Sequence, residues 1–341
     1  MSMRAARRPI VTALVALALV GTTAACAPEP TTHLLTGAAG MSSAAQEPAQ
    51  ESAPQAPSGG AETGTAAAAQ DCADGQPAVA SMSPGNDVEV TSGSTMAAIR
   101  ERGTLVVGVS ADTLLMGSRN PFNSDIEGFD IDVARQIADA ILGDPDKIRF
   151  RVITSGDRET VLADHDVDVV VRAFTINCER WENIAFSAEY YHAGQKLLVP
   201  TTSNVAGIAD LSGQRVCAPE GTTTLERLGE WEGVEAVPAT THTTCLVLFQ
   251  QGAVDAITGD DTVLAGFAAQ DPYAKVVGDA VSEEPYGVGI PADQPDMVRF
   301  VNGVLEDMVD GGQWAKSYDR WLGDALGPAP APPEPVYGRT P

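Results

Sequence analysis

The stretch VDVVVRAFTINCERW, Val167–Trp181, decides the fold of this chain. Its first half is a valine-rich run typical of a buried strand in a parallel sheet, and a helix is predicted to start near Cys178. The polar residues between strand and helix include Arg172 and Thr175, and Arg180 follows at the helix start. Because ligands of open parallel sheets bind beyond the carboxyl ends of the strands, this loop is a candidate for part of a binding site.

The residues before this stretch alternate in the same way between strand and helix. The apolar runs Gly103–Ser110 and Ile148–Ile153 predict two buried strands. Between them, apolar residues recur at helical spacing over residues 131–141, with Asp130 as the expected N-cap and Gly143 as the stop signal. A short helix before Val167 completes the order β-α-β-α-β, which predicts a parallel sheet covered by helices.

A similar alternation follows in the second half of the chain. The segment Gly213–Trp231 predicts strand, turn and helix, and Thr243–Asp261 predicts helix, strand and loop. The pieces VLADHDVDVVV and VLFQQGAVDAI share their order of apolar and polar residues, although any two α/β units produce such an echo. We interpret the chain as two similar lobes whose loops meet across a cleft.

The polar residues that follow the predicted strands suit the two charged ends of an α-amino acid. Thr175 and Arg180 flank a helix start, where free backbone N–H groups and a guanidinium favour a carboxylate. The turn Gly221–Thr224 offers a second such helix start, and Asp260 and Asp261 offer a counter-charge. The ordinary alternatives are a surface arginine paired with a neighbouring glutamate, capping threonines and solvated aspartates.

The charge and the N-terminus predict an exported protein. A net charge of −25 argues against partners such as nucleic acid or an anionic lipid surface. Three arginines precede the apolar run Ile10–Val20, which is short for a membrane span, and small residues lead to Cys26. We expect residues 1–25 to be a lipoprotein signal, Cys26 to be lipidated and the protein to lie on the extracytoplasmic face of the membrane. An ordinary secretory signal cleaved nearby is the alternative.

Two segments have compositions unsuited to a packed core. Residues 26–90 are rich in Pro, Ala, Ser, Thr and Gly, and we expect a disordered tether. Residues 327–341 are predicted to form an extended Pro-rich tail. The residues between them are numerous enough for one large domain or two small ones.

The cysteines indicate disulfides rather than a metal site. Besides Cys26, the chain has Cys72, Cys178, Cys217 and Cys245, an even number in an exported chain. They predict two disulfides, for which three pairings are open. Because no Cys-x-x-Cys pair exists and the four histidines are scattered, a zinc or redox site is not expected.

Five motifs together carry a resemblance to a known family. They are GFDIDVARQIA, VDVVVRAFTINCERWENIAFSAEYY, GQRVCAPEGTTT, VDAITGDDTVLAG and EPYGVGIP. The chain resembles the amino-acid-binding type of periplasmic solute-binding protein from about Ser94 to the tail, most of all the glutamine/glutamate-binding lipoproteins of actinobacteria. The resemblance implies an α/β, two-lobed type II fold with two mixed sheets flanked by helices and a two-strand hinge. Lobe one comprises residues 91–198 and 287–326, and lobe two residues 199–286.

The resemblance also implies a role for most of the polar loop residues. Arg180 and Thr175 hold the ligand α-carboxylate, helped by the backbone of Ala173. The turn residues Thr222 and Thr223 of lobe two contribute to binding the same α-carboxylate. Asp260 takes the α-ammonium, with Asp261 as the fallback.

One departure from the family pattern and two further arginines concern affinity and specificity. Ser110 stands where relatives usually carry an aspartate, which weakens the amino site or shifts its work to Asp112. Arg172 and Arg158 are candidates for recognising a side-chain carboxylate. The resemblance further implies disulfides Cys217–Cys245 and Cys72–Cys178, the second orienting the loop before Arg180.

The expected function is capture of a free amino acid of the glutamate, glutamine, aspartate and asparagine class by lobe closure. The resemblance implies presentation to a membrane partner, either the permease of an ABC importer or an amino-acid sensor. We expect a monomer without cofactor or metal, and not an enzyme. One alternative is a cyclohexadienyl (prephenate/arogenate) dehydratase of the same fold, with Glu220 as general acid. Another is a structural lipoprotein whose cleft binds nothing.

Overall fold

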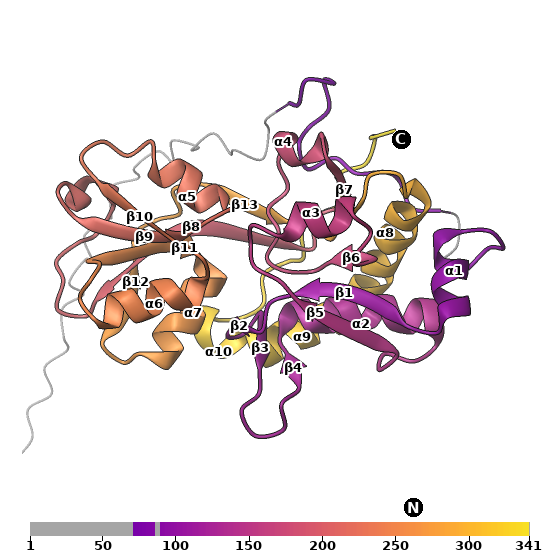
Figure 1. Cartoon of the computed structure of the whole chain (residues 1–341), viewed down its shortest axis with the longest axis horizontal. Helices are drawn as coiled ribbons and strands as arrows, with labels where there is room; N and C mark the ends of the chain where they lie inside the picture. Colours follow the sequence, from indigo (N-terminus) through magenta and orange to yellow (C-terminus); the bar gives the residue numbers. More distant parts are fainter. Residues whose placement is uncertain (1–70, 86–88, 341) are drawn as a thin grey trace, which may run out of the picture. The chain divides into compact units, whose positions relative to one another are not determined.

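The computed structural model describes residues 71–85 and 89–340, which form two mixed sheets with helices around them (Figure 1). The predicted signal segment, Cys26 and most of the predicted tether lie outside the described residues. Among the residues that the structure describes, no helix has the length and apolar character needed to cross a membrane.

The first sheet contains the parallel strands that the sequence predicts. Its order is β5-β1-β6-β14-β7, with β1 parallel to β5 and β6, and β14 antiparallel to β6 and β7. The strands are β1 (Leu105–Val109), β5 (Ile148–Val152), β6 (Val169–Val170), β7 (Ile184–Phe186) and β14 (Gly289–Pro291). A separate small sheet is made of β2 (Asp112–Thr113), β3 (Gly117–Arg119) and β4 (Ile126–Glu127).

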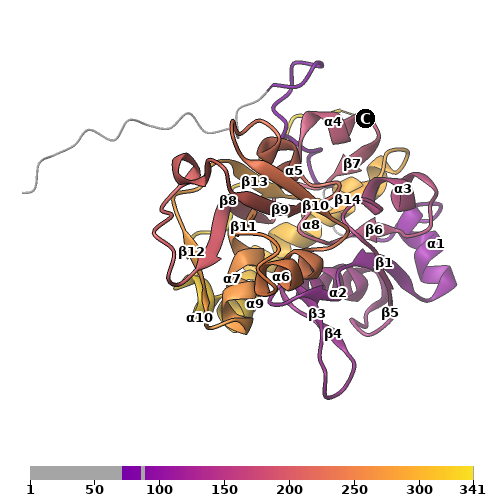
Figure 2. The same cartoon turned by 60° about the vertical axis from the view of Figure 1, so that its left-hand side comes forward.

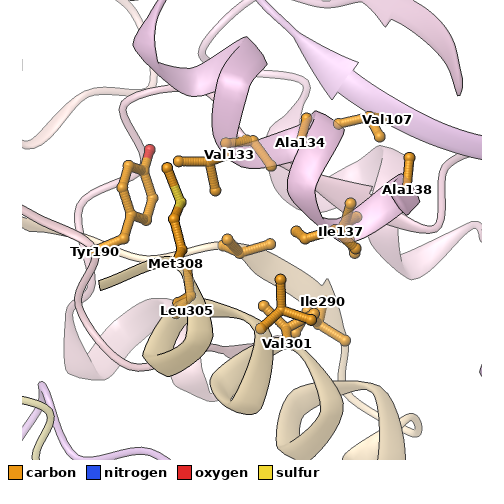
Figure 3. Close-up of a cluster of buried hydrophobic side chains, with 14 of the residues drawn as sticks. Val107, Val133, Ala134, Ile137, Ala138, Tyr190, Ile290, Val301, Leu305 and Met308 are labelled. Carbon is orange, nitrogen blue, oxygen red and sulfur yellow. The ribbon is translucent and has the colours of Figure 1, made fainter. Parts of the chain in front are cut away.

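Seven helices accompany these strands in the described part of the chain, and together they form what we call the first lobe. They are α1 (Thr95–Arg102), α2 (Phe129–Leu142), α3 (Arg158–Ala163), α4 (Cys178–Trp181), α8 (Pro295–Asp310), α9 (Gln313–Trp321) and α10 (Gly323–Leu326). Figure 3 shows the apolar stripe of α2, including Val133 and Ile137, facing Val301 and Leu305 of α8. The helical spacing seen in the sequence thus buries α2 in the core.

The start of α2 differs from the prediction at Asp130. The helix begins after Gly128, whose φ of 142° suits glycine and whose missing Cβ would lie 2.3 Å from the carbonyl oxygen of Met116. Asp130 is therefore not the N-cap but a buried residue of the first turn. Its carboxylate accepts hydrogen bonds from the Ala173 N–H (2.9 Å) and the Tyr190 hydroxyl (2.7 Å).

The second sheet and its helices form the second lobe, best seen in Figure 2. Its order is β10-β9-β11-β8-β12, with β13 paired to β8. The strands are β8 (Tyr191–Pro200), β9 (Arg215–Pro219), β10 (Glu235–Ala239), β11 (Ala256–Asp260), β12 (Ala274–Val277) and β13 (Glu283–Tyr286). The helices are η2 (Ile208–Leu211), α5 (Thr223–Leu228), α6 (His242–Gln250) and α7 (Asp261–Gln270).

Two antiparallel strands join the lobes. The first residues of β8, Tyr191–Gly194, pair with β13, while the rest of β8 pairs with β11 and β12 of the second sheet. The strand β13 leads back to β14 of the first sheet. This arrangement agrees with the two-strand hinge that the resemblance implied, whereas the lobe boundaries at 198/199 and 286/287 stay predictions.

The described part of the expected tether differs from a flexible chain. Residues 78–82 are buried against the first lobe, and Ser81 forms a β-bridge with Tyr337 of the expected tail. The Ser81 hydroxyl also donates to the Phe186 carbonyl oxygen (2.9 Å). Ala80 and Ser81 also accept hydrogen bonds from Arg339 of the C-terminal segment, which the composition of residues 26–90 as a whole does not reveal.

Candidate functional site

A small cavity of about 10 Å³ lies between the two lobes. The first lobe lines it with Arg158, Ala173 and Thr175, and the second with Thr222, Thr223, Thr224, His242 and Asp260. These residues follow the carboxyl ends of β5, β6, β9 and β10 and end β11. The prediction that the loops after the parallel strands meet across a cleft is therefore confirmed.

Asp260 presents an unsatisfied oxygen in this buried site. It is the last residue of β11, and its Oδ2 accepts a hydrogen bond from the Tyr286 hydroxyl (2.6 Å). Its Oδ1 is buried and has no hydrogen-bond partner among residues 71–85 and 89–340. Burial raises the pKa of Asp260, and the nearby Glu284 carboxylate raises it further. A buried carboxylate oxygen without a donor is costly, so a cationic donor in the cavity would be stabilising.

Asp261 points elsewhere. Its carboxylate accepts from the backbone N–H of Thr262 (2.8 Å), as expected at the start of α7. The side chain lines a separate groove that also involves His192 and Lys196. The structure thus brings the predicted residue Asp260 to the cavity, and not the fallback Asp261.

Arg158 is the guanidinium in the cavity wall. Its Nη1 donates to the Ala173 carbonyl oxygen (2.9 Å) and its Nη2 to the Gly221 carbonyl oxygen (2.7 Å), which bridges the two lobes. The side chain is buried, lies over the ring of Phe174 at 4.3 Å and has no ion pair in the described part of the chain. Burial and the neighbouring Arg180 lower the pKa of Arg158.

Arg180 lies beside Arg158 and shares its surroundings. Its Nη2 approaches the same Gly221 carbonyl oxygen (3.3 Å), its Nη1 donates to the Thr175 carbonyl oxygen (2.6 Å), and it too stacks on Phe174. Arg180 is only 4% exposed, and among the described residues its one ion pair is with Glu159 at 3.7 Å. The ordinary alternative of a surface arginine paired with Glu179 or Glu182 therefore does not apply.

Arg180, Arg172, Ser110 and Asp112 line no part of the cavity. Arg172 is buried but turns to the Ile153 carbonyl oxygen (2.9 Å) and the Ser155 hydroxyl (2.7 Å). The Ser110 hydroxyl donates to the Asp112 carboxylate (2.9 Å). The Asp112 carbonyl oxygen in turn accepts from Thr243 of the second lobe (3.1 Å). Ser110 and Asp112 thus belong to an interlobe contact next to the cavity.

Thr222 and Thr223 line the cavity and also form hydrogen bonds that hold the start of α5. Thr222 is the N-cap of α5, and its hydroxyl oxygen accepts from the Leu225 N–H (3.1 Å), as the capping alternative predicted. The Thr223 hydroxyl donates to the buried carboxylate of Glu284 on β13 (2.6 Å). This bond ties the start of α5 to a strand that joins the lobes.

Sequence reasoning missed His242 and the structural role of Asp130. His242 begins α6, lines the cavity, and has a buried Nδ1 without a partner among the described residues. Burial and Arg172 lower the pKa of His242 to about 3, so its imidazole is neutral at neutral pH. The available signal was its position directly after β10. Asp130 holds the Ala173 N–H and so supports a backbone with φ of 40°, an uncommon value for alanine.

Both disulfides implied by the resemblance are present. Cys217 is bonded to Cys245 within the second lobe, and Cys72 to Cys178 at the start of α4. The residues that the structure describes contain no cluster of His, Cys, Asp and Glu suited to a metal ion.

The chain is similar to known binding proteins. Residues 105–324 match the model of the bacterial extracellular solute-binding proteins, family 3. The chain is 34% identical to the ABC transporter glutamine-binding protein GlnH of Bacillus subtilis over 67% of this chain and 84% of that protein. It is 31% identical to the glutamate-binding protein GluB of Corynebacterium efficiens, over 69% and 83% of the two chains.

A solved structure shares the fold. An ancestral arginine-binding protein bound to glutamine is 30% identical, with a TM-score of 0.61 over 65% of this chain and 99% of that one. Together with the family match, which spans well over half of the sequence, this result shows that the chain belongs to family 3 of the bacterial extracellular solute-binding proteins.

Proposed function

We propose that this protein captures one free amino acid of the glutamine, glutamate and aspartate class between its lobes. The observation that carries the proposal is that a buried carboxylate and a buried cation face the same cavity. Asp260 offers a buried oxygen without a donor among the described residues, Arg158 lies in the cavity wall without an ion pair among the described residues, and Arg180 lies beside Arg158, outside the lining, with an ion pair to Glu159 at 3.7 Å. A zwitterion supplies an ammonium to the first and a carboxylate to the second, which lowers the cost of burying both.

The orientation of the ligand follows from these positions. The α-ammonium donates to Asp260, while the α-carboxylate lies toward Arg180 and Thr175. Arg158 and the neutral His242 then remain for the side chain. A cation next to a neutral imidazole suits a carboxylate or an amide oxygen, and the two named relatives bind glutamine and glutamate.

Capture requires movement of the lobes. A cavity of about 10 Å³ holds roughly one water molecule, far less than an amino acid. The ligand therefore enters when the lobes part about β8 and β13, and it contacts both lobes only when they approach again. Binding shifts that equilibrium because the carboxylate and the cations come largely from different lobes.

Arg158→Gln is expected to reduce glutamate affinity about tenfold more than glutamine affinity. The change removes the cation proposed to face a side-chain carboxylate, whereas an amide loses only a hydrogen bond. Isothermal titration with glutamate, glutamine, aspartate and asparagine measures the ratio. Arg151→Gln is the control, since Arg151 forms an exposed ion pair with Asp166. Equal losses for glutamate and glutamine would show that Arg158 does not distinguish them, and no binding by the unchanged protein would refute the proposed function.

The chain is a binding protein rather than an enzyme, as are the relatives named above. The dehydratase alternative relied on Glu220, but this residue is exposed and lines no part of the cavity. The alternative of an inactive cleft leaves the unsatisfied Asp260 oxygen unexplained.

We further propose that the protein is lipid-anchored through Cys26 and presents its ligand to a membrane permease. The name of the Bacillus relative supports an ABC transporter as the partner, and a membrane sensor is the second candidate. The apolar run before Cys26 supports the anchor. Cys26→Ala is expected to abolish metabolic labelling with a radioactive fatty acid and to release the protein from the membrane fraction. Unchanged labelling would place the lipid on another residue, and no labelling of the unchanged protein would refute the lipid anchor.

A further inference from the structure

The two ends of the described chain are joined next to α4. Residues 72–82 lie against α4 and β7, and residues 336–339 pair with them. The Ser81 N–H donates to the Val336 carbonyl oxygen (2.9 Å), and the Arg339 N–H donates to the Ser81 carbonyl oxygen (3.1 Å). We call residues 72–82 and 336–339 together the terminal clamp.

Arg339 connects the parts of this clamp. Although it is the third residue from the end of the chain, it is only 8% exposed. Its Nε donates to the Ala80 carbonyl oxygen (2.9 Å) and its Nη1 to the Asp74 carboxylate (2.6 Å). Its guanidinium lies 4.1 Å from the centre of the Trp181 ring. Such burial of a terminal arginine exceeds what a loose tail needs.

The clamp holds α4 on both sides of Arg180. Cys178 is bonded to Cys72, and the Trp181 indole N–H donates to the Ala78 carbonyl oxygen (2.8 Å) below the Arg339 guanidinium. The helix α4 has four residues, too few to be stable by its own hydrogen bonds. Its position therefore depends on its packing, and the clamp supplies contacts to the residues two before and one after Arg180.

We propose that the terminal clamp, with Arg339 at its centre, positions Arg180 for the ligand carboxylate. Arg339 touches no residue of the cavity and acts through Trp181 and Cys178, so it is a positioning residue. The inference rests on the proposed function, because it assumes that Arg180 contacts the ligand. It adds that the last residues of the chain control affinity at a site formed by other elements.

Arg339→Gln is expected to weaken amino-acid binding about tenfold, a typical effect for a residue that acts on a site indirectly. Arg299→Gln is the matched control, since the Arg299 guanidinium donates to the Ser83 carbonyl oxygen (2.9 Å), directly after the clamp residues 72–82. Arg339→Lys is expected to recover part of the affinity, because it keeps the charge toward Asp74 but not the planar guanidinium over Trp181.

Hydrogen exchange of the ligand-free protein separates this inference from the proposed function. Arg339→Gln should speed exchange of the amides of residues 178–181 while leaving those of α6 unchanged. If no amino acid binds the unchanged protein but Arg339→Gln still accelerates exchange at α4, the proposed function is wrong, whereas the conclusion that the clamp holds α4 in place is kept. If exchange at α4 is unchanged, or if Arg299→Gln weakens binding equally, the clamp does not position Arg180.

The disulfide provides an independent test of the same path. The double change Cys72→Ser with Cys178→Ser should weaken binding to a similar extent as Arg339→Gln. All three substitutions together should cost less than the product of the separate losses, because both act through α4. Fully multiplicative losses would mean that the disulfide and Arg339 act by separate routes, which would overturn a single clamp.

Discussion

Asp260→Asn is expected to weaken amino-acid binding by at least about thirtyfold while the fold is kept. Removing one partner of a buried, hydrogen-bonded charge pair costs roughly 2–5 kcal/mol, and each 1.4 kcal/mol is tenfold in affinity. Asparagine has nearly the same size, and its carbonyl oxygen can still accept from the Tyr286 hydroxyl that bonds Asp260. It lacks the charge that the α-ammonium needs. Isothermal titration measures the loss, and circular dichroism checks the fold.

Asp261→Asn is the matched control for this prediction. Asp261 is the next residue and carries the same carboxylate, but it lies in a different groove and caps the Thr262 N–H. Its substitution is expected to change affinity by no more than about twofold. If Asp261→Asn is the more damaging of the two, the ammonium site has been assigned to the wrong aspartate.

The same titration should depend on pH through Asp260. Burial and the Glu284 carboxylate raise its pKa above the ordinary 3.8, Asp261 acts in the same direction, and Arg158 opposes them. The ligand-free folded state then binds this proton more tightly than the unfolded chain, so this contribution to stability is present at low pH and is lost as pH rises through the raised pKa. An ammonium ligand needs the ionised form. Affinity should therefore increase as pH rises from the ordinary pKa of 3.8 through the raised pKa of Asp260. In Asp260→Asn, affinity should no longer change with pH over this range.

Adjacent residues show why the sequence could name the site only in part. Asp260 ends β11 and Asp261 begins α7, and the change of direction between them places the Asp260 side chain in the cavity and the Asp261 side chain in a different groove. Arg158 and Arg172 were equal candidates, yet only Arg158 faces the second lobe, through Gly221. Periodicity predicts which element a residue belongs to, whereas the packing of two lobes decides where its side chain lies.

The fold was predictable where local pattern determines it. The parallel strands β1, β5 and β6 and the helix α2 are visible as apolar runs and helical spacing. The antiparallel strand β14 and the joining pair β8 and β13 combine residues about a hundred apart, so only the family resemblance indicated them. The hydrogen bonds of Asp130 could not be predicted from the sequence for a related reason. Its partners, Ala173 and Tyr190, are distant in the sequence, while a cap is a local feature.

Arg180→Gln is expected to reduce affinity by at least about thirtyfold for every amino acid that binds. The change removes a guanidinium that is buried beside the cavity and stacked on Phe174, and glutamine cannot grip a carboxylate with two parallel charged hydrogen bonds. Because all amino acids share the α-carboxylate, the loss should be uniform. That pattern differs from the selective loss expected for Arg158→Gln, and the same set of ligands measures both.

Arg172→Gln is the control for burial, since Arg172 is an equally buried arginine whose guanidinium turns to Ile153 and Ser155 instead of the cavity. Its substitution should lower thermal stability and leave affinity within a few-fold of the unchanged protein. If Arg180→Gln retains affinity while Arg158→Gln loses it uniformly, the α-carboxylate lies at Arg158. The Gly221 carbonyl oxygen is the reason why the two variants must be compared with each other. The two guanidinia share it, so a single ligand carboxylate that approaches from the second lobe meets both arginines, and the pattern of losses decides which of them carries the charge–charge contact.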